Sequence, residues 1–338
     1  MGGGNFFSKY LFSCPFGQFS SDNSKKDKTI IDVDPVNTSD MISDDDDSSV
    51  EELDIMDFTR SGEQEQCSPA ATVCDLVDDS CSIVSDSTEN EDHQRLQSMY
   101  HEAFFPLTQD EEDQVSQAFS DYNRDIVLVT HEESNIEITG EVFQCLKPRG
   151  WLNDEVINLY LQLLKERENR QPERFLKCHF FNALFYKRLT SGESGYDFKS
   201  VRRWTSPLKI GYNLIECDKL FVPIHKEMHW FLGIINKKDE KFQYLDSLKG
   251  MDAEVLDVLA RYYVDEVKDK TGEDIDVSSW KREYADELPA QKNWSDCGMF
   301  MIKYIDFYSR GLGLFFDQGD IPYFRKRTAK EILRLRAD

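Results

Sequence analysis

The stretch QKNWSDCGMFMI, residues 291–302, joins a polar loop to an apolar run and places a cysteine where the two meet. The apolar run continues to Tyr308 and predicts a helix that Gly311 ends. A thiol at a helix N-terminus lies beside unpaired N–H groups and the positive end of the helix dipole, and both favour the thiolate. Cys297 is therefore a candidate nucleophile, and Gly298 would let a substrate backbone approach it. For Cys297 alone, a small buried residue at a helix start is the simpler interpretation, so catalysis requires partners elsewhere.

A histidine and an aspartate suited to assist a thiol lie on neighbouring strands. His229 stands just before a strand at residues 230–235, and Asp246 ends the next strand, 242–245. A hairpin of these strands brings the two side chains within hydrogen-bond reach, giving an imidazole base oriented by a carboxylate. Gln291 offers an amide donor to a developing oxyanion. His225 is a competing base, and a satisfied histidine or a turn aspartate would explain either residue alone.

Strands gather in the middle of the chain, with helices before and after them. Thr108 followed by Glu111 has the form of a capping box at a helix start. Asn153 opens a second helix, whose apolar positions recur on one face. Two further strands are predicted at 126–129 and 221–224, and a further helix at 255–267. This order indicates an α+β fold rather than a doubly wound sheet.

The 338-residue chain divides into an acidic tail and a globular remainder. Residues 1–92 hold 22 Asp and Glu but only 5 Lys and Arg, a net charge of −17 out of −24 for the whole chain. All five tryptophans lie beyond this segment. The tail holds too few large side chains to offset the entropy of ordering, so we expect disorder over residues 1–95 and a globular domain over 103–338.

Composition excludes several classes of protein. No apolar run reaches the roughly 18 residues that a membrane-spanning helix needs. The net charge of −24 argues against nucleic acid as a partner, because phosphate binding needs a basic surface. Eight cysteines spread over a long chain indicate reduced intracellular thiols rather than a disulfide framework. Cys67, Cys74 and Cys81 lack the neighbouring His or fourth Cys that a zinc site requires.

Several short motifs occur along the chain in the following order: Trp151-Leu152-Asn153-Asp154-Glu155, Val201-Arg202-Arg203-Trp204-Thr205, His229-Trp230, Tyr244-Leu245-Asp246-Ser247, and Gln291 followed by Asp296-Cys297-Gly298. Together they closely resemble the SUMO-specific (ubiquitin-like-protein-specific) cysteine proteases. The stretches 177–182 and 325–338 are most similar to the plant, early-in-short-days-type branch of that family. The resemblance covers roughly residues 103–338 and leaves the acidic tail outside.

The resemblance implies a papain-like, two-lobed α+β domain that hydrolyses the bond after the C-terminal Gly-Gly of SUMO, releasing SUMO from substrate lysines and trimming its precursor. By motif match Cys297 is the nucleophile, His229 the general base, Asp246 its orienting partner and Gln291 an oxyanion donor. Substrate-binding roles are implied for Trp151 and Trp230, which would line a tunnel over Gly-Gly, and for Asp154 and Arg203 on the SUMO-facing surface. Only glycine lets a backbone thread between two indole faces, which fits the tunnel. Trp204 and Trp280 are expected in the core.

The same resemblance implies no metal and no organic cofactor, SUMO and SUMO-conjugated proteins as partners, a monomer, and a location in the nucleus or alternatively the cytoplasm. In the tail, residues 30–34 (Ile-Ile-Asp-Val-Asp) look like a SUMO-interacting motif, an apolar strand flanked by acids that adds to a partner's sheet edge. Similar patches occupy 73–79 and 83–86. A solvated acidic linker is the alternative for all three.

One position departs from the family pattern: Trp294 stands where a glycine usually follows the Asn of the Gln-x-Asn stretch. If that position needs positive φ or little bulk, the loop beneath the oxyanion is altered. Three alternatives therefore stay open, namely a protease for another Gly-Gly-ended modifier, a weakened SUMO-binding pseudo-protease, and a structural metal-binding protein. The strand-end position of His229 disfavours the last.

Overall fold

A computed structural model describes residues 87–338, with side chains from residue 94 onward. Its helices are α1 (Ser87–Ala103), α2 (Gln109–Ala118), α3 (Gly140–Phe143), α4 (Asp154–Arg170), α5 (Phe185–Leu189), α6 (Phe198–Val201), α7 (Pro207–Ile210), α8 (Ala253–Thr271), α9 (Cys297–Ser309) and α10 (Ile321–Leu333). Its strands are β1 (Val127–His131), β2 (Ile136–Thr139), β3 (Cys178–Phe180), β4 (Lys219–Lys226), β5 (His229–Asn236), β6 (Lys241–Leu245) and β7 (Lys281–Tyr284). Short 3-10 turns lie at Asp121–Asn123, Gln144–Leu146, Leu214–Glu216 and Gln318–Asp320.

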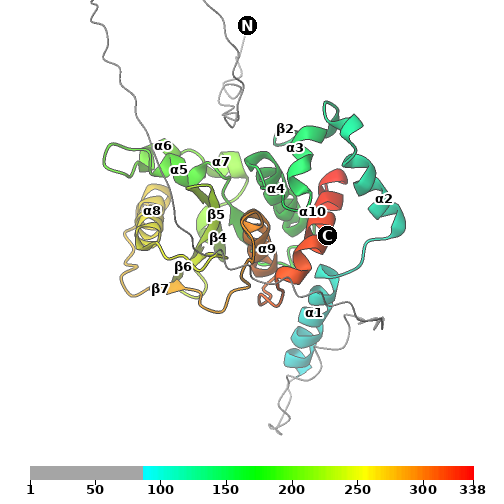
Figure 1. The fold of residues 1–338 in the computed structure, drawn as a ribbon. Coiled ribbons are helices and arrows are strands. Elements are labelled where there is room, and N and C mark those ends of the chain that lie inside the picture. Colours follow the sequence, from blue (N-terminus) through cyan, green and yellow to red (C-terminus); the bar gives the residue numbers. More distant parts are fainter. Residues whose placement is uncertain (1–86) are drawn as a thin grey trace, which may run out of the picture. The chain divides into compact units, whose positions relative to one another are not determined.

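A mixed five-stranded sheet in the order β3-β4-β5-β6-β7 forms the centre (Figure 1). Its middle strands are antiparallel, while β3 and β7 pair in parallel with β4 and β6. Strands β4 and β5 are joined by a two-residue turn, Glu227–Met228, where both residues have positive φ (52° and 63°). Such a turn matches the right-handed twist of a hairpin and fixes its register, here Lys226 opposite His229.

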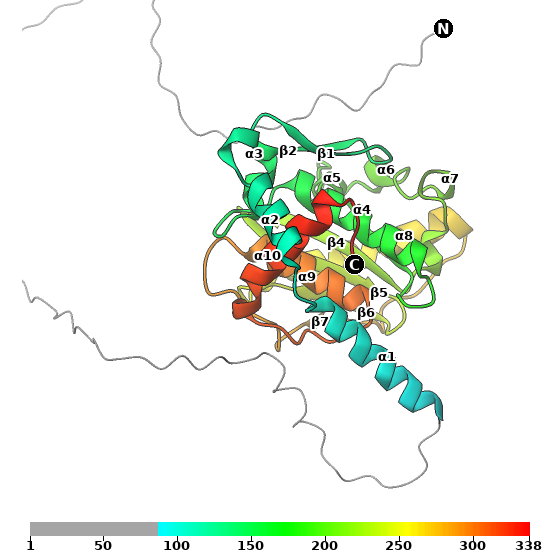
Figure 2. The same ribbon diagram turned by 90° about the vertical axis from the view of Figure 1, so that its right-hand side faces the viewer.

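Helices cover both faces of the sheet. Helix α8 packs on one face of β5 and β6, and α9 packs on β5 from the other side (Figures 1 and 2). Alternate residues of each strand therefore enter different hydrophobic clusters: Phe221 and Leu232 join α4, α9 and α10, whereas Val222 and Phe231 join α8. Two clusters on opposite faces agree with the expected two-lobed α+β domain.

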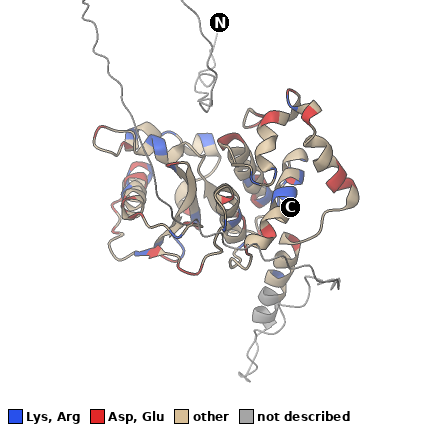
Figure 3. Cartoon of the chain, in the orientation of Figure 1, with Lys and Arg blue, Asp and Glu red and all other residues tan. Residues whose placement is uncertain are grey.

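The elements predicted from hydrophobic periodicity are confirmed. Thr108 caps α2 in a capping box with Glu111, Asn153 caps α4, and α9 ends shortly before Gly311, which has a φ of +74°. Ion pairs join α2 to the C-terminal helix α10: Glu111 lies 2.7 Å from Arg334, and Glu112 lies 3.0 Å from Lys326. The distribution of acidic and basic residues along the chain is drawn in Figure 3.

Helix α1 differs from expectation because it begins at Ser87, within the range 1–95 predicted as tail. Its first turns are polar and lack the regularly spaced apolar residues of an amphipathic helix. The sequence therefore predicted that they belong to the disordered tail. The helix is anchored by its other end, where Met99 and Ala103 are buried against the domain. The tail segments 30–34, 73–79 and 83–86, together with Cys67, Cys74 and Cys81, lie outside the described residues.

Candidate active site

Cys297 is the first residue of α9 and is 2% exposed. The helix behind it is buried almost throughout, because α9 packs between the sheet and α4. A side chain at Gly298 would bring its Cβ within 2.8 Å of the Leu152 Cβ. Glycine is therefore needed for the approach of the Trp151–Leu152 segment, a packing reason beyond access for a substrate backbone.

His229 and Asp246 are in direct contact, with Nε2 of the imidazole 2.6 Å from Oδ1 of the carboxylate. The contact arises from the hairpin, since His229 begins β5 and Asp246 follows the paired strand β6. Asp246 is buried, and it also accepts hydrogen bonds from the backbone N–H groups of Leu248 (2.8 Å) and Gly250 (3.1 Å). Both carboxylate oxygens are thus held, so the carboxylate fixes the imidazole in one orientation.

The electrostatics of His229 favour a charged imidazole. Burial lowers the pKa of His229, but hydrogen bonds to Asp246 and Cys297 outweigh it and raise the pKa to about 9. A hydrogen bond to the charged form of a group stabilises that form. The thiol at the start of α9 and the Asp246 carboxylate therefore both favour the charged form of the imidazole between them in the proposed triad.

His225, the competing base, is held elsewhere. Its ring lies 4.5 Å from that of Trp230, and Asp246 pairs with His229 instead. Burial lowers the pKa of His225. The structure thus brings only one of the two histidines to the carboxylate.

Gln291 is buried in the loop that leads to Cys297. Its Oε1 accepts from the Ser247 hydroxyl at 2.6 Å, its Nε2 donates to the Asn293 carbonyl at 2.6 Å, and its N–H donates to the Ser247 carbonyl at 3.1 Å. The amide is therefore fixed between the residue after Asp246 and the nucleophile loop. Its role as an oxyanion donor stays a prediction.

The two tryptophans expected beside the substrate adjoin the same segment. Trp230 is 6% exposed and donates its indole N–H to the Leu152 carbonyl at 3.1 Å. Trp151, the preceding residue, is 44% exposed. Two further residues expected to bind substrate are exposed and do not belong to the group Cys297, His229 and Asp246. They are Asp154, the first residue of α4, and Arg203, which follows α6. Trp204 and Trp280, expected in the core, are partly buried and pack against the hydrophobic cluster that includes residues of α8.

Sequence reasoning missed the residue that holds this assembly together, Arg325 of α10. Its buried guanidinium binds Asp296, the residue before Cys297, with Nη2 2.6 Å and Nε 3.1 Å from Oδ1. The same side chain donates to the carbonyls of Cys145, Lys147 and Gly150. Hydrogen bonds from Asn293 and Arg325 overcome the effect of burial and lower the pKa of Asp296. The only available sequence signal was the resemblance of the 325–338 stretch to the family.

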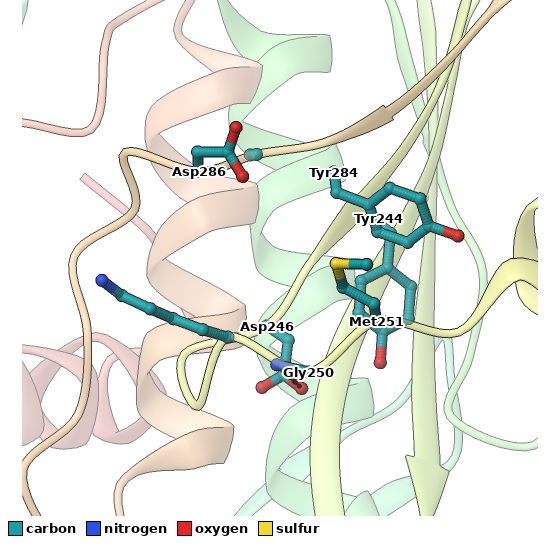
Figure 4. A pocket seen from close by; sticks show the side chains of 8 residues that line it. Tyr244, Asp246, Gly250, Met251, Tyr284 and Asp286 are labelled. Atoms are coloured by element: carbon teal, nitrogen blue, oxygen red, sulfur yellow. Dashed lines mark hydrogen bonds between the residues drawn. The ribbon is translucent and has the colours of Figure 1, made fainter.

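A small pocket of about 60 Å³ adjoins Asp246 (Figure 4). Its lining includes Tyr244, Gly250, Met251, Tyr284 and Asp286. The volume holds a few water molecules and not a peptide. Within residues 87–338, no three His, Cys, Asp or Glu side chains are grouped so as to hold a metal ion. No helix in this part of the chain is long and apolar enough to cross a membrane.

A thiol at a helix start together with an imidazole paired to a carboxylate is typical of the class of cysteine proteases. Residues 150–337 match the model of the Ulp1 protease family, C-terminal catalytic domain. The chain belongs to the Ulp1 protease family, which confirms the resemblance seen in its motifs.

Individual relatives of the chain support the same family assignment. The chain is 62% identical over 237 residues to the ubiquitin-like-specific protease ESD4 of Arabidopsis thaliana, covering 70% of this chain and 48% of the relative. It is 59% identical over 238 residues to the putative ubiquitin-like-specific protease 1B of the same plant, covering 70% of each. The structure of the C-terminal Ulp1 protease domain in complex with Smt3, the yeast ortholog of SUMO, is similar, with a TM-score of 0.57, 31% identity and coverage of 68% of this chain and 96% of that one. The chain spans about half the length of the first two curated relatives it matches.

Proposed function

We propose that this protein is a SUMO-specific cysteine protease that cleaves after the C-terminal Gly-Gly of SUMO, releasing SUMO from substrate lysines and maturing its precursor. The observation that carries the proposal is the 2.6 Å contact between His229 and Asp246, with Cys297, the first residue of α9, also raising the pKa of this imidazole. The choice of substrate is supported by a relative that is a ubiquitin-like-specific protease and by the Ulp1 domain solved in complex with the yeast ortholog of SUMO.

The mechanism follows from the positions of the side chains. The Cys297 thiolate attacks the carbonyl of the terminal glycine, and its negative charge passes to the carbonyl oxygen. The Gln291 amide and backbone N–H groups at the start of α9 stabilise that oxyanion. Imidazolium at His229 then protonates the leaving amine, and a thioester remains on Cys297. Water, deprotonated by His229, hydrolyses the thioester and restores the thiol.

Selectivity for glycine is proposed to come from Trp151 and Trp230. The Trp230 indole is fixed by its hydrogen bond to the Leu152 carbonyl, while Trp151 is partly exposed at the adjoining residue. A chain passing between two indoles has room for glycine but not for a larger side chain. Asp154 and Arg203 are proposed to contact the folded part of SUMO from the exposed surface.

The pseudo-protease alternative rested on Trp294, and two observations count against it. Trp294 is not among the described residues with positive φ, and its side chain is 80% exposed rather than pressed into the loop. The catalytic residues keep their contacts beside it. We therefore expect an active enzyme.

A panel of substrates tests the proposed function. SUMO, ubiquitin and a third Gly-Gly-ended modifier are each joined at the C-terminus to aminocoumarin, and the full-length protein is assayed on all three. We expect kcat/KM for SUMO to exceed that for the other modifiers by 100-fold or more, that is by about 2.7 kcal/mol. Equal rates, or faster cleavage of another modifier, would rule out SUMO specificity.

A further inference from the structure

Ser247 is the residue directly after Asp246, and it is 2% exposed. Its hydroxyl donates to Oε1 of Gln291 at 2.6 Å, and its carbonyl accepts from the Gln291 backbone N–H at 3.1 Å. Asp246 holds the imidazole of His229, with Oδ1 2.6 Å from Nε2. Two successive residues after β6 therefore hold the proposed base and the proposed oxyanion donor.

The two hydrogen-bond partners of the Gln291 side chain fix which way round its amide lies. A carbonyl oxygen only accepts hydrogen bonds, so the amide atom 2.6 Å from the Asn293 carbonyl is the nitrogen Nε2. The amide oxygen Oε1 then faces Ser247 and accepts from its hydroxyl. An amide nitrogen carries two hydrogens, and the bond to Asn293 uses one of them. The second N–H is left to donate to an oxyanion.

Burial makes the Ser247 hydroxyl difficult to replace. Gln291 is 8% exposed and Ser247 is 2% exposed, so water has little access to the contact between them. A buried acceptor that loses its donor raises the free energy of that arrangement. Without the hydroxyl, the amide recovers a donor by rotating or by shifting toward water, and either movement displaces the second N–H. An oxyanion donor stabilises the transition state only when it is held about 3 Å from the developing charge.

We propose that Ser247 is a positioning residue, which orients the Gln291 amide so that its second N–H donates to the carbonyl oxygen of the scissile bond during the attack. The backbone bond between the two residues places Gln291, and the hydroxyl of Ser247 sets the direction of the amide. The hydroxyl acts on the substrate only through that amide. This inference rests on the proposed function and deepens it, because it links the end of β6 to both proton transfer and oxyanion stabilisation.

The variant Ser247→Ala removes the hydroxyl and keeps the backbone bond to Gln291. On SUMO–aminocoumarin we expect kcat to fall about tenfold and KM to stay within about twofold, because a misaligned donor costs less than the roughly 100-fold or more lost when a donor is removed. The loss should not add to that of Gln291→Ala: once the amide is absent, Ser247→Ala should change kcat by less than about twofold.

Ser309→Ala is the matched control. Ser309 is a buried serine at the end of α9 opposite to Cys297, and its hydroxyl accepts from Nη2 of Arg167 at 3.1 Å. This variant also removes a buried hydroxyl that accepts or donates a side-chain hydrogen bond, but it leaves Gln291 untouched. Its kcat on SUMO–aminocoumarin should equal that of the parent.

Two inhibitors separate the orientation of the donor from a general effect on the site. When SUMO carries a C-terminal aldehyde, the sulfur of Cys297 bonds to the aldehyde carbon and the thiol proton passes to the oxygen, which then occupies the place of the oxyanion. When SUMO carries a C-terminal alkyne, the same thiol adds across a carbon–carbon triple bond and no oxyanion forms. Ser247→Ala should weaken inhibition by the aldehyde about tenfold and react with the alkyne at the parental rate. The fraction labelled by the alkyne also measures the folded enzyme, to which kcat is referred.

Other outcomes overturn the proposal. A kcat for Ser247→Ala equal to that of the parent would show that the amide keeps its orientation without the hydroxyl. Losses that add in the double variant, or equal losses toward the aldehyde and the alkyne, would show that Ser247 acts by a route other than Gln291. A Ser247→Ala protein that does not react with the alkyne would show that the hydroxyl supports the fold instead. A parent enzyme that cleaves no SUMO substrate would contradict the proposed function itself, and this result is distinct from the others.

Discussion

Arg325 and Asp296 form a buried ion pair, with Nη2 of the guanidinium 2.6 Å from the carboxylate oxygen Oδ1. Asp296 directly precedes the candidate nucleophile, and Arg325 lies on α10, near the end of the sequence. The same guanidinium binds the Gly150 carbonyl, next to Trp151. One side chain thus positions both the thiol-bearing loop and the segment expected to cover the substrate.

Replacing Arg325 by Lys should therefore impair both stability and catalysis. Lysine keeps the charge but loses the fork that reaches Asp296 and three backbone carbonyls at once. Each buried acceptor left without its donor costs about 1–3 kcal/mol of folding free energy. Urea unfolding and kcat on SUMO–aminocoumarin measure the two effects. Arg202→Lys is the control, because Arg202 binds Asp269 at the surface of the protein. This change should lower the free energy of unfolding by less than about 1 kcal/mol. Equal losses in the two variants would contradict the role given to Arg325.

The pKa of His229 predicts the pH dependence of cleavage. Because the pKa is raised to about 9, the imidazolium persists at neutral pH, and kcat/KM should fall as the pH rises through about 9. The same shift stabilises the fold fully below the ordinary pKa of 6.5, and this contribution is lost as the pH passes 9. Asp246→Asn removes a bond that raises the pKa, so the alkaline limb should move toward lower pH. A limb at the same pH in parent and variant would show that another group controls it.

The hairpin turn before His229 stores strain that a glycine would remove. Met228 has a φ of 63°, a backbone conformation that residues other than glycine rarely adopt. Its side chain is exposed. Met228→Gly should raise the free energy of unfolding by about 0.5–1 kcal/mol, because glycine takes positive φ without a steric cost. Thermal or urea unfolding measures it. Glu254→Gly, inside the first turn of α8, is the opposite control and should destabilise the domain. A destabilising effect of Met228→Gly would mean that the methionine side chain makes a contact worth more than the strain.

The acidic tail is expected to act on SUMO chains only. If residues 30–34 bind SUMO, tethering raises its concentration at the catalytic domain. Deleting residues 1–86 should then slow the cleavage of poly-SUMO while leaving single-unit cleavage at the parental rate. Alanine at Ile30, Ile31 and Val33 should reproduce the loss, and added salt should reduce the difference by screening the acidic flank. Chains processed equally fast by truncated and full-length protein at low salt would identify the tail as a linker.

The sequence predicted those parts of the site that depend on local patterns. The apolar run after Cys297 predicted the start of α9. The two neighbouring strands now seen as β5 and β6 predicted that His229 and Asp246 would meet across a hairpin. Contacts between distant segments left no such pattern. Nothing local to Arg325 indicates that it reaches Asp296, and Ser247 gave no sign of its bond to Gln291. The start of α1 was missed for a related reason, because its polar first turns depend on an anchor further along the helix.

The most direct test of the account is the covalent capture of the nucleophile. The full-length protein is incubated with SUMO that carries a C-terminal electrophile, and the adduct is mapped by mass spectrometry of its peptides. We predict one adduct, on Cys297, formed by the parent and absent from Cys297→Ser, which should still bind SUMO. The other described cysteines, Cys145, Cys178 and Cys217, provide the internal comparison, since burial raises the pKa of each. An adduct on any of these, or none in the folded parent, would contradict the assignment of Cys297 as the nucleophile.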